Sequence, residues 1–205
     1  RHRVGHLLTL GRLAEAEGEL ARLATAPRVE PYFEMRAWAA WQRGRLAEAT
    51  EDAHAALGQA SERGRTFYRI FDLMLLTLLS ASAGAPEQAR EFLRQYREET
   101  TAMPGDFATF QALLAEAFIA IASGAAAESH APLSRALEIG SRQRLSSWWG
   151  WSPAVMVALL DEALRQGFSV PYCRDLVRTH RLAPASADVD DWPWPVRVRT
   201  LGRFE

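Results

Sequence analysis

Apolar residues recur at helical spacing along most of this 205-residue chain, in blocks separated by short polar turns. The block at 65–83 is apolar on almost every side, which indicates a helix that is buried on several sides. The pattern therefore predicts an all-α protein. The predicted helices lie at residues 1–10, 13–24, 31–41, 46–60, 65–83, 86–99, 107–123, 126–139, 153–166 and 171–181.

One hexapeptide, Gly-Arg-Leu-Ala-Glu-Ala, occurs twice, starting at Gly11 and again 33 residues later at Gly44. Weaker copies start at Gly84 and Gly124, at spacings of 40 residues, and a degenerate fifth copy starts at Gly167. Each copy lies between two predicted helices, so each marks the turn of a helix hairpin. Hairpins of this size bury their apolar faces by stacking on neighbouring copies, which predicts a helical repeat protein.

The motif suits a tight turn between two close helices, because glycine accepts positive φ and a small residue five positions later permits close packing. It resembles the tetratricopeptide repeat, with Ala16, Ala49 and Ala89 at the small position of the second helix. Ser129 replaces this alanine in the fourth copy, and the 40-residue spacings exceed the family's usual ~34 residues. The resemblance implies a right-handed superhelix of about five hairpins over residues 1–182, less regular than a typical array.

The character of the chain changes after residue 182. Residues 183–195 predict a polar linker that ends in the extended run Trp192-Pro-Trp-Pro195. Residues 196–205 begin with alternating apolar and polar positions and predict a strand. Because a single strand cannot satisfy its own backbone groups, we expect it to open a following domain. We expect the chain to be a piece of a longer protein, since it also starts inside a helical pattern and not at a methionine.

The residues around this junction carry a second resemblance, over about forty residues. They resemble the junction in large bacterial LuxR-type, ATP-dependent transcriptional activators that are similar to the maltose-regulon activator and carry an OmpR-type winged-helix domain. In that family the Leu-Gly-Arg-Phe segment opens the first winged-helix strand. The resemblance implies a cytoplasmic regulatory region between a nucleotide-dependent switch and a DNA reader, both of which would be partners of this region. The matching segments are Leu164-Arg-Gln-Gly-Phe-Ser-Val-Pro-Tyr172, Leu176-Val-Arg178, Arg181-Leu-Ala-Pro184 and Trp192 to Glu205.

Composition excludes several function classes. The 24 basic residues are all arginine and face 25 acidic residues, so the net charge is −1 and a nucleic-acid surface is not expected. The absence of lysine excludes Walker A loops and Schiff-base chemistry. The single cysteine, Cys173, excludes an internal disulfide, fits a reducing compartment, and is expected to be a small buried residue. The absence of an apolar run of 18 residues argues against a membrane span.

No catalytic or metal-binding pattern emerges from the sequence. His2 and His6 stand four residues apart on a helix, but no third metal ligand accompanies them. The segment Gly150-Trp-Ser-Pro-Ala154 lacks the second glycine of a nucleophile elbow. We therefore expect neither an enzyme nor a cofactor. Four basic residues lie at the end of the last predicted helix: Arg174, Arg178, His180 and Arg181. Positive charges there are stabilised by the helix dipole, which explains them structurally; phosphate binding is the alternative.

Two further features concern local structure. Asp106 is expected to cap the helix at 107–123. Trp148, Trp149 and Trp151 lie close together after the fourth hairpin, and they form either a packing plug between helices or the wall of a ligand site.

Aligned on the tetratricopeptide repeat, the first helix of each hairpin lines a concave groove that is aromatic and weakly polar. Such a groove suits a small polar-apolar effector such as a sugar, or a peptide or neighbouring domain; the third alternative is that these residues are plain core. The predicted function is regulation by an effector or partner, and the alternative is a constitutive scaffold for protein interaction or homo-oligomerisation. The candidate binding residues are Glu34, Trp38, Trp41, Gln42, Phe71, Met74, Gln111 and Phe118, with Leu78, Ser82, Leu114 and Ile121 beside them.

Overall fold

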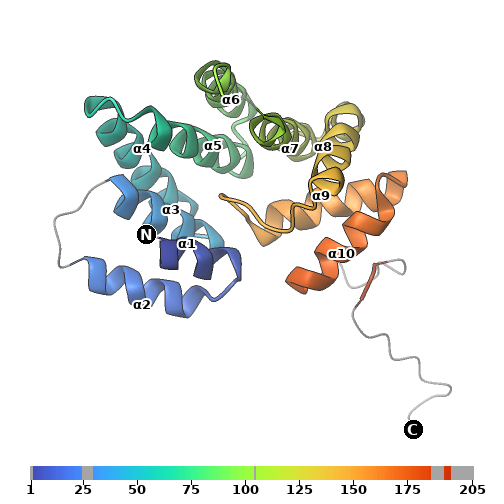
Figure 1. The fold of residues 1–205 in the computed structure, drawn as a ribbon, viewed down its shortest axis with the longest axis horizontal. Helices are drawn as coiled ribbons and strands as arrows, with labels where there is room; N and C mark the ends of the chain where they lie inside the picture. The colour runs from blue at the N-terminus through green and yellow to red at the C-terminus, as the bar shows by residue number, and fades with distance from the viewer. Residues whose placement is uncertain (1, 25–29, 104, 186–191, 195–205) are drawn as a thin grey trace, which may run out of the picture.

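A computed structural model of the chain describes residues 2–24, 30–103, 105–185 and 192–194 (Figure 1). These residues form ten α-helices and one short 3-10 helix, and they contain no strand. The all-α prediction is confirmed, whereas the predicted strand at 196–205 lies outside the described residues. The helices are α1 His2–Thr9, α2 Leu13–Leu23, α3 Glu30–Gln42, α4 Leu46–Glu62, α5 Thr66–Ser82, α6 Pro86–Thr100, α7 Asp106–Ala122, α8 His130–Arg142, α9 Pro153–Gln166 and α10 Val170–His180, with η1 at Ala126–Ser129.

Consecutive helices pair as hairpins, and each hairpin turn is closed by a glycine in the left-handed region. Gly44 has φ 76°, and the residue after it donates its backbone N–H to Ala40 O at 2.9 Å, five residues back. This is the hydrogen bond that ends a helix at a left-handed glycine. The five glycines of the repeated motif share this geometry: Gly11, Gly44, Gly84, Gly124 and Gly167, with φ between 70° and 78°.

The small residues of the motif lie where the two helices of a hairpin meet. Ala16, Ala49, Ala89 and Ser129 are all completely buried. A larger side chain at these positions would force the paired helices apart, so the sequence motif specifies the helix spacing directly.

The hairpins are arranged along an arc (Figure 1). Odd-numbered helices contact one another in order, α1 with α3, α3 with α5, α5 with α7 and α7 with α9. They form the inner layer of the arc, and α2, α4, α6 and α8 pack outside them. Helix α5 lies in the middle of the inner layer, and its residues from Leu73 to Ala81 are all buried, as its apolar sequence predicts.

Three details differ from the predictions. Asp106 is the first residue of α7 and makes no capping hydrogen bond; its carboxylate instead accepts hydrogen bonds from Arg142, at 2.5 Å, and Gln143. The fourth hairpin resumes after Gly124 with the 3-10 turn η1 before α8 begins. Within the predicted linker, Trp192 is buried and its indole N–H donates to Leu182 O at 2.9 Å. At Trp192 the chain therefore packs on the helical domain and is not a free spacer.

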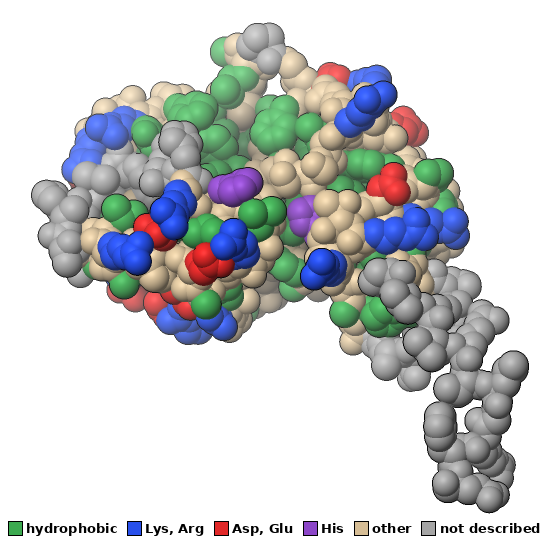
Figure 2. Space-filling view, turned by 60° about the horizontal axis from the view of Figure 1, so that its bottom comes forward, with side chains coloured by type: hydrophobic (Ala, Val, Ile, Leu, Met, Phe, Trp, Pro, Cys, Tyr) green, Lys and Arg blue, Asp and Glu red, His purple; other side chains and the backbone are tan. Residues whose placement is uncertain are grey.

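Arginine and carboxylate side chains lie next to one another on the surface, with hydrophobic side chains between them (Figure 2). Across the described part of the chain, every helix is too short or too polar to cross a membrane.

Candidate functional site

The inner side of the arc is occupied by the connection between α8 and α9, residues 145–152, which we call the Trp segment (Figure 1). The segment is not helical. It turns at Trp148–Trp151, where the Trp151 N–H donates to Trp148 O at 3.2 Å. Gly150 occupies the third position of this turn with φ 78°, a conformation that side chains other than glycine rarely adopt. On either side of this turn, Trp149 packs against α3 and α5, whereas Trp148 and Trp151 pack against α7 and α10.

The start of the Trp segment is held by side chains of α10. The Tyr172 hydroxyl donates to Leu145 O at 2.6 Å, and the His180 Nε2–H donates to Ser146 O at 2.5 Å. Both acceptors are backbone carbonyls, so these two hydrogen bonds fix the path of the backbone through the start of the segment.

The end of the segment is held in the same way by the inner helices. Gln111 of α7 donates from Nε2 to Trp149 O at 3.1 Å. On α3, the Trp38 indole N–H donates to Trp151 O at 2.8 Å, and Gln42 Nε2 reaches the same oxygen at 3.2 Å. Four carbonyls of the Trp segment thus accept hydrogen bonds from side chains of three helices, which is how a groove holds a bound peptide.

The Trp149 indole lies over α1, α3 and α5. Its ring centroid is 4.8 Å from that of Trp38 and 5.3 Å from that of Phe71. On α1, a Cβ atom added to Gly5 would lie 2.7 Å from Trp149 Cζ3. Only glycine at position 5 leaves room for this indole, so the sequence of α1 is matched to the Trp segment.

The other two indoles fill the space between α7 and α10. Trp151 is 2% exposed, and its ring stacks on His180 with centroids 3.8 Å apart. Trp148 meets Phe110 of α7 edge to face at 4.8 Å and Trp151 at 4.6 Å. Of the two alternatives for the three tryptophans, the structure has the packing plug.

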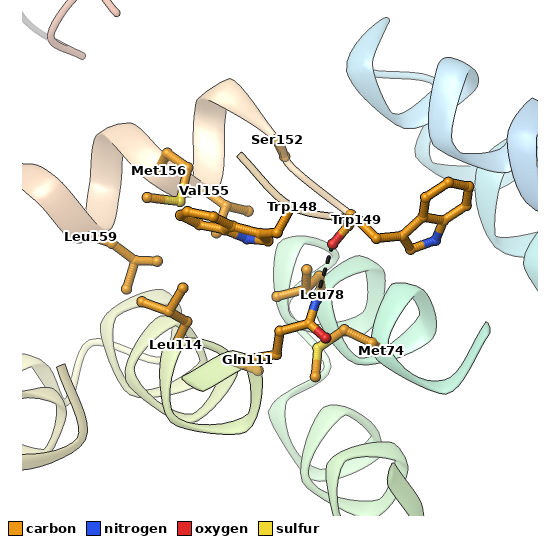
Figure 3. A pocket seen from close by; sticks show the side chains of 12 residues that line it. Met74, Leu78, Gln111, Leu114, Trp148, Trp149, Ser152, Val155, Met156 and Leu159 are labelled. Carbon is orange, nitrogen blue, oxygen red and sulfur yellow. Dashed lines mark hydrogen bonds between the residues drawn. The ribbon is translucent and has the colours of Figure 1, made fainter. Parts of the chain in front are cut away.

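A cavity of about 20 Å³ remains beneath the segment, between Trp148, Gln111 and α9 (Figure 3). Its walls are apolar apart from Gln111 and Ser152, and its volume is close to that of one water molecule. With the Trp segment in place, this part of the groove has no room for an effector.

Most of the predicted groove residues meet at this segment. Trp38, Gln42 and Gln111 donate to its carbonyls, Phe71 packs on Trp149, and Met74 lines the cavity (Figure 3). The remaining three, Glu34, Trp41 and Phe118, are also buried but make none of these hydrogen bonds. Residues 145–152 of the same chain cover the groove that these residues were predicted to line. The ligand-binding role of these residues stays a prediction.

Sequence reasoning missed three residues that hold the segment: Gly5, Tyr172 and His180. Tyr172 occupies the small-residue position of the degenerate fifth repeat, and a tyrosine there signals that something other than the hairpin partner is contacted. His180 is one of the four basic residues predicted to interact with the dipole of the last helix, but its ring stacks on Trp151.

The site offers hydrogen bonds and apolar surface more than ionic chemistry. Burial raises the pKa values of Tyr172 and of Tyr96, so both hydroxyls stay protonated. Burial also raises the pKa of the Cys173 thiol to about 12, which leaves it an inert core residue, as predicted. Within the described residues, no group of three or more His, Cys, Asp or Glu side chains is arranged to hold a metal ion.

Comparisons of the chain with protein-family models, with curated proteins and with solved structures give no match.

Proposed function

We propose that this chain is a regulatory domain whose inner face binds an extended, aromatic-rich segment or an effector that competes with it. Its ten helices would form a right-handed superhelix of tetratricopeptide-like hairpins, with the Trp segment as the occupant in the present state.

One observation carries the proposal: the Trp segment is bound by its backbone carbonyls. Two side-chain amides, an indole N–H, an imidazole N–H and a hydroxyl donate to Leu145 O, Ser146 O, Trp149 O and Trp151 O. Carbonyls are common to every peptide, so donors arranged in this way can hold other segments of the same shape. The indoles then add selectivity, because their rings fit spaces beside Phe71, Gly5 and Phe110.

Regulation would follow from competition for this face. A tethered segment is present at high effective concentration, so a competitor gains access only by binding the open state more tightly than the closed one. The two states differ in the position of residues 145–152, which link the fourth hairpin to the fifth. Displacing the segment would therefore change how α9 and α10 sit on the rest of the arc.

The wider role rests on the resemblance of the C-terminal junction to bacterial transcriptional activators. In such a protein, this region would lie in the cytoplasm between a nucleotide-dependent switch and a winged-helix domain, and would transmit binding at its inner face to either neighbour. Mixed charges on the surface support a domain that contacts proteins or small molecules and not nucleic acid (Figure 2). The proposed function contains no catalytic step.

The test is binding of the segment in trans. A fluorescent peptide with the sequence of residues 144–153 is titrated against the wild-type domain and against a variant with Trp148, Trp149 and Trp151 replaced by serine. The opened variant should bind the peptide at least about tenfold more tightly than the wild type, measured by fluorescence anisotropy, because the tethered copy no longer competes. A peptide with serine in place of its tryptophans is the matched control.

A second variant guards against misfolding of the first. Gly150→Ala strains only the turn of the tethered segment, since φ is 78° there, and it leaves the inner face that the peptide would contact unchanged. Gly18→Ala on the exposed face of α2 is its control. Absence of peptide binding by both folded opened variants contradicts the proposal, and so does equal binding by the wild type.

A scaffold role is the second candidate, favoured by apolar residues on the first hairpin. Leu10 and Leu23 are 52% and 40% exposed. If they mediate self-association, the wild-type domain forms a dimer by analytical ultracentrifugation at micromolar concentration, and Leu10→Glu with Leu23→Glu abolishes it. A monomer at all concentrations removes this candidate.

A further inference from the structure

A second recess opens on the other side of Phe71 and Gln111, between α5, α6 and the start of α7. Its volume is about 230 Å³. Unlike the inner face, it is not filled by another part of the described chain. Its lining residues include Phe67, Phe71, Tyr96, Met103, Phe107, Ala108 and Gln111.

The rim of this recess gathers exposed apolar side chains. Phe67 is 56% exposed, Met103 43% and Phe107 39%, and these are three of the five large hydrophobic residues that are exposed in the described chain. Scattered exposed apolar residues are ordinary, but a cluster around one concavity marks a binding site. The remaining two, Leu10 and Leu23, lie on the first hairpin.

The deep end of the recess is polar but uncharged. The Tyr96 hydroxyl donates to Gln111 Oε1 at 3.1 Å, and Gln111 in turn donates to Trp149 O. The Tyr96 oxygen therefore has lone pairs left to accept a hydrogen bond. No Arg, Asp, Glu or His is among the described lining residues, so a charged ligand would lose hydration without gaining a counter-charge.

The size of the recess limits the ligand. Its 230 Å³ exceeds the ~150 Å³ cavity that holds a benzene ring, and it lies below the ~300 Å³ at which pockets for drug-sized ligands begin. One aromatic ring or two fused rings would fill it.

We propose that this recess binds a neutral aromatic molecule of one or two rings that carries one hydroxyl or N–H donor, as a phenol, naphthol or indole does. The rings would lie between Phe67, Phe71 and Phe107, and the donor would face Tyr96. A peptide segment is disfavoured because Gln111 is the only side-chain amide among the described lining residues, and its Nε2 already donates to Trp149 O. Binding here does not rest on the proposed function of the inner face.

The test uses 5-fluoroindole as the probe, observed by ¹⁹F NMR with the wild-type domain. For a ligand of about ten heavy atoms in an apolar site, the expected Kd is on the order of 0.1–1 mM. 2-Naphthol should compete with 5-fluoroindole, whereas benzoate, which carries a charge, should not. An absence of line broadening or shift at millimolar protein and probe overturns the proposal.

Two variants locate the site. Ala108→Leu places a larger side chain in the recess and should weaken binding at least about tenfold, while Ala122→Leu, at an exposed position near the end of the same helix, should leave binding unchanged. Phe67→Ala, which removes one exposed wall, should weaken binding severalfold, and Leu10→Ala is its exposed control. Unchanged affinity in folded Ala108→Leu overturns the proposal. Binding of an N-acetyl-phenylalanine peptide without binding of 5-fluoroindole also overturns it, in favour of a protein partner. Neither result depends on whether the Trp peptide binds in trans.

Discussion

Helices α5 and α7 present aromatic side chains on two sides, and only one of these sides is covered by another part of the described chain. Toward the centre of the arc, Phe71 and Gln111 meet the Trp segment, and the space left over is about 20 Å³. Toward α6, Phe67 and Phe107 surround a recess of about 230 Å³ that nothing in the described chain fills. The same kind of surface is covered by the chain on one side and forms an open recess on the other.

The comparison teaches that an aromatic groove in a repeat protein is not evidence of an open site. Whether such a groove is open depends on whether another part of the same chain packs into it. The side nearest the predicted ligand positions is closed by residues 145–152, which come from a connection far along the sequence. The open side shares Phe71 and Gln111 with the closed one, so these two residues lie at the boundary between a structural and a binding surface.

The largest difference between the two sides should appear on deleting one aromatic ring from each. Trp151→Ala removes a fully packed indole and should lower the free energy of unfolding by about 3–5 kcal/mol. Phe67→Ala removes a ring that is more than half exposed and should cost at most about 1 kcal/mol. Thermal unfolding measures both, with each kcal/mol worth about 2–4 °C in a domain of this size. Similar losses in the two variants would mean that the two surfaces are packed alike.

A smaller effect is expected at the residue that the two sides share. Gln111→Leu keeps the volume but leaves Trp149 O and the Tyr96 hydroxyl without their partner, which should cost about 1–3 kcal/mol. Urea unfolding followed by tryptophan fluorescence measures the loss. Gln143→Leu is the matched control, because its amide donates to Asp106 on the exposed surface and should cost under ~0.5 kcal/mol. Equal losses of unfolding free energy in the two variants would show that the buried hydrogen bonds of Gln111 do not stabilise the domain.

The hairpins themselves could be predicted from sequence because their determinants are local. A glycine that must adopt positive φ and an alanine five residues later specify both the turn and the helix contact, as Gly44 and Ala49 show. Helix ends fall close to the predicted ones for the same reason, and the bounds of α9, Pro153–Gln166, match those predicted.

The occupant of the inner face could not be predicted because its determinants are tertiary. Trp149 fits only because Gly5 lacks a side chain, and these residues are joined by no local pattern. A cluster of three tryptophans indicated a large buried area, but its sequence does not say which helices would surround it. Asp106 shows the converse error, since a good local N-cap residue pairs instead with Arg142 across the helix hairpin.

A third change acts on the turn that points the indoles inward. Gly150→Ala should destabilise the domain by about 1–2 kcal/mol through backbone strain, since φ is 78° and the added Cβ would meet only Leu78 Cδ1 at 4.0 Å. Gly58→Ala, at an exposed position inside α4 with nothing nearby, should instead stabilise it by about 0.5–1 kcal/mol. Opposite signs in chemical denaturation would establish that the Trp segment depends on this turn. Stabilisation by both changes would mean that the turn relaxes freely.

The smallest effect concerns the residue at which the chain leaves α8 for the inner face. Arg144 has φ 53°, and Leu145 N–H donates to Gly140 O at 2.9 Å, the same bond that closes the hairpin turn at Gly84. An arginine thus stands where the hairpins have glycine.

Arg144→Gly should therefore stabilise the domain by about 0.5–1 kcal/mol, since glycine adopts this conformation without steric strain. Gly84→Ala makes the reverse change at the equivalent turn and should destabilise by a similar amount. The free energies of unfolding of both variants are measured in urea. They compare the turn at Gly84, which only joins two helices, with the turn at Arg144, which leads into the Trp segment. Destabilisation by Arg144→Gly would instead mean that the arginine restricts the path of the chain into the groove. The position of the Trp segment would then depend on this turn as well as on the hydrogen bonds to its carbonyls.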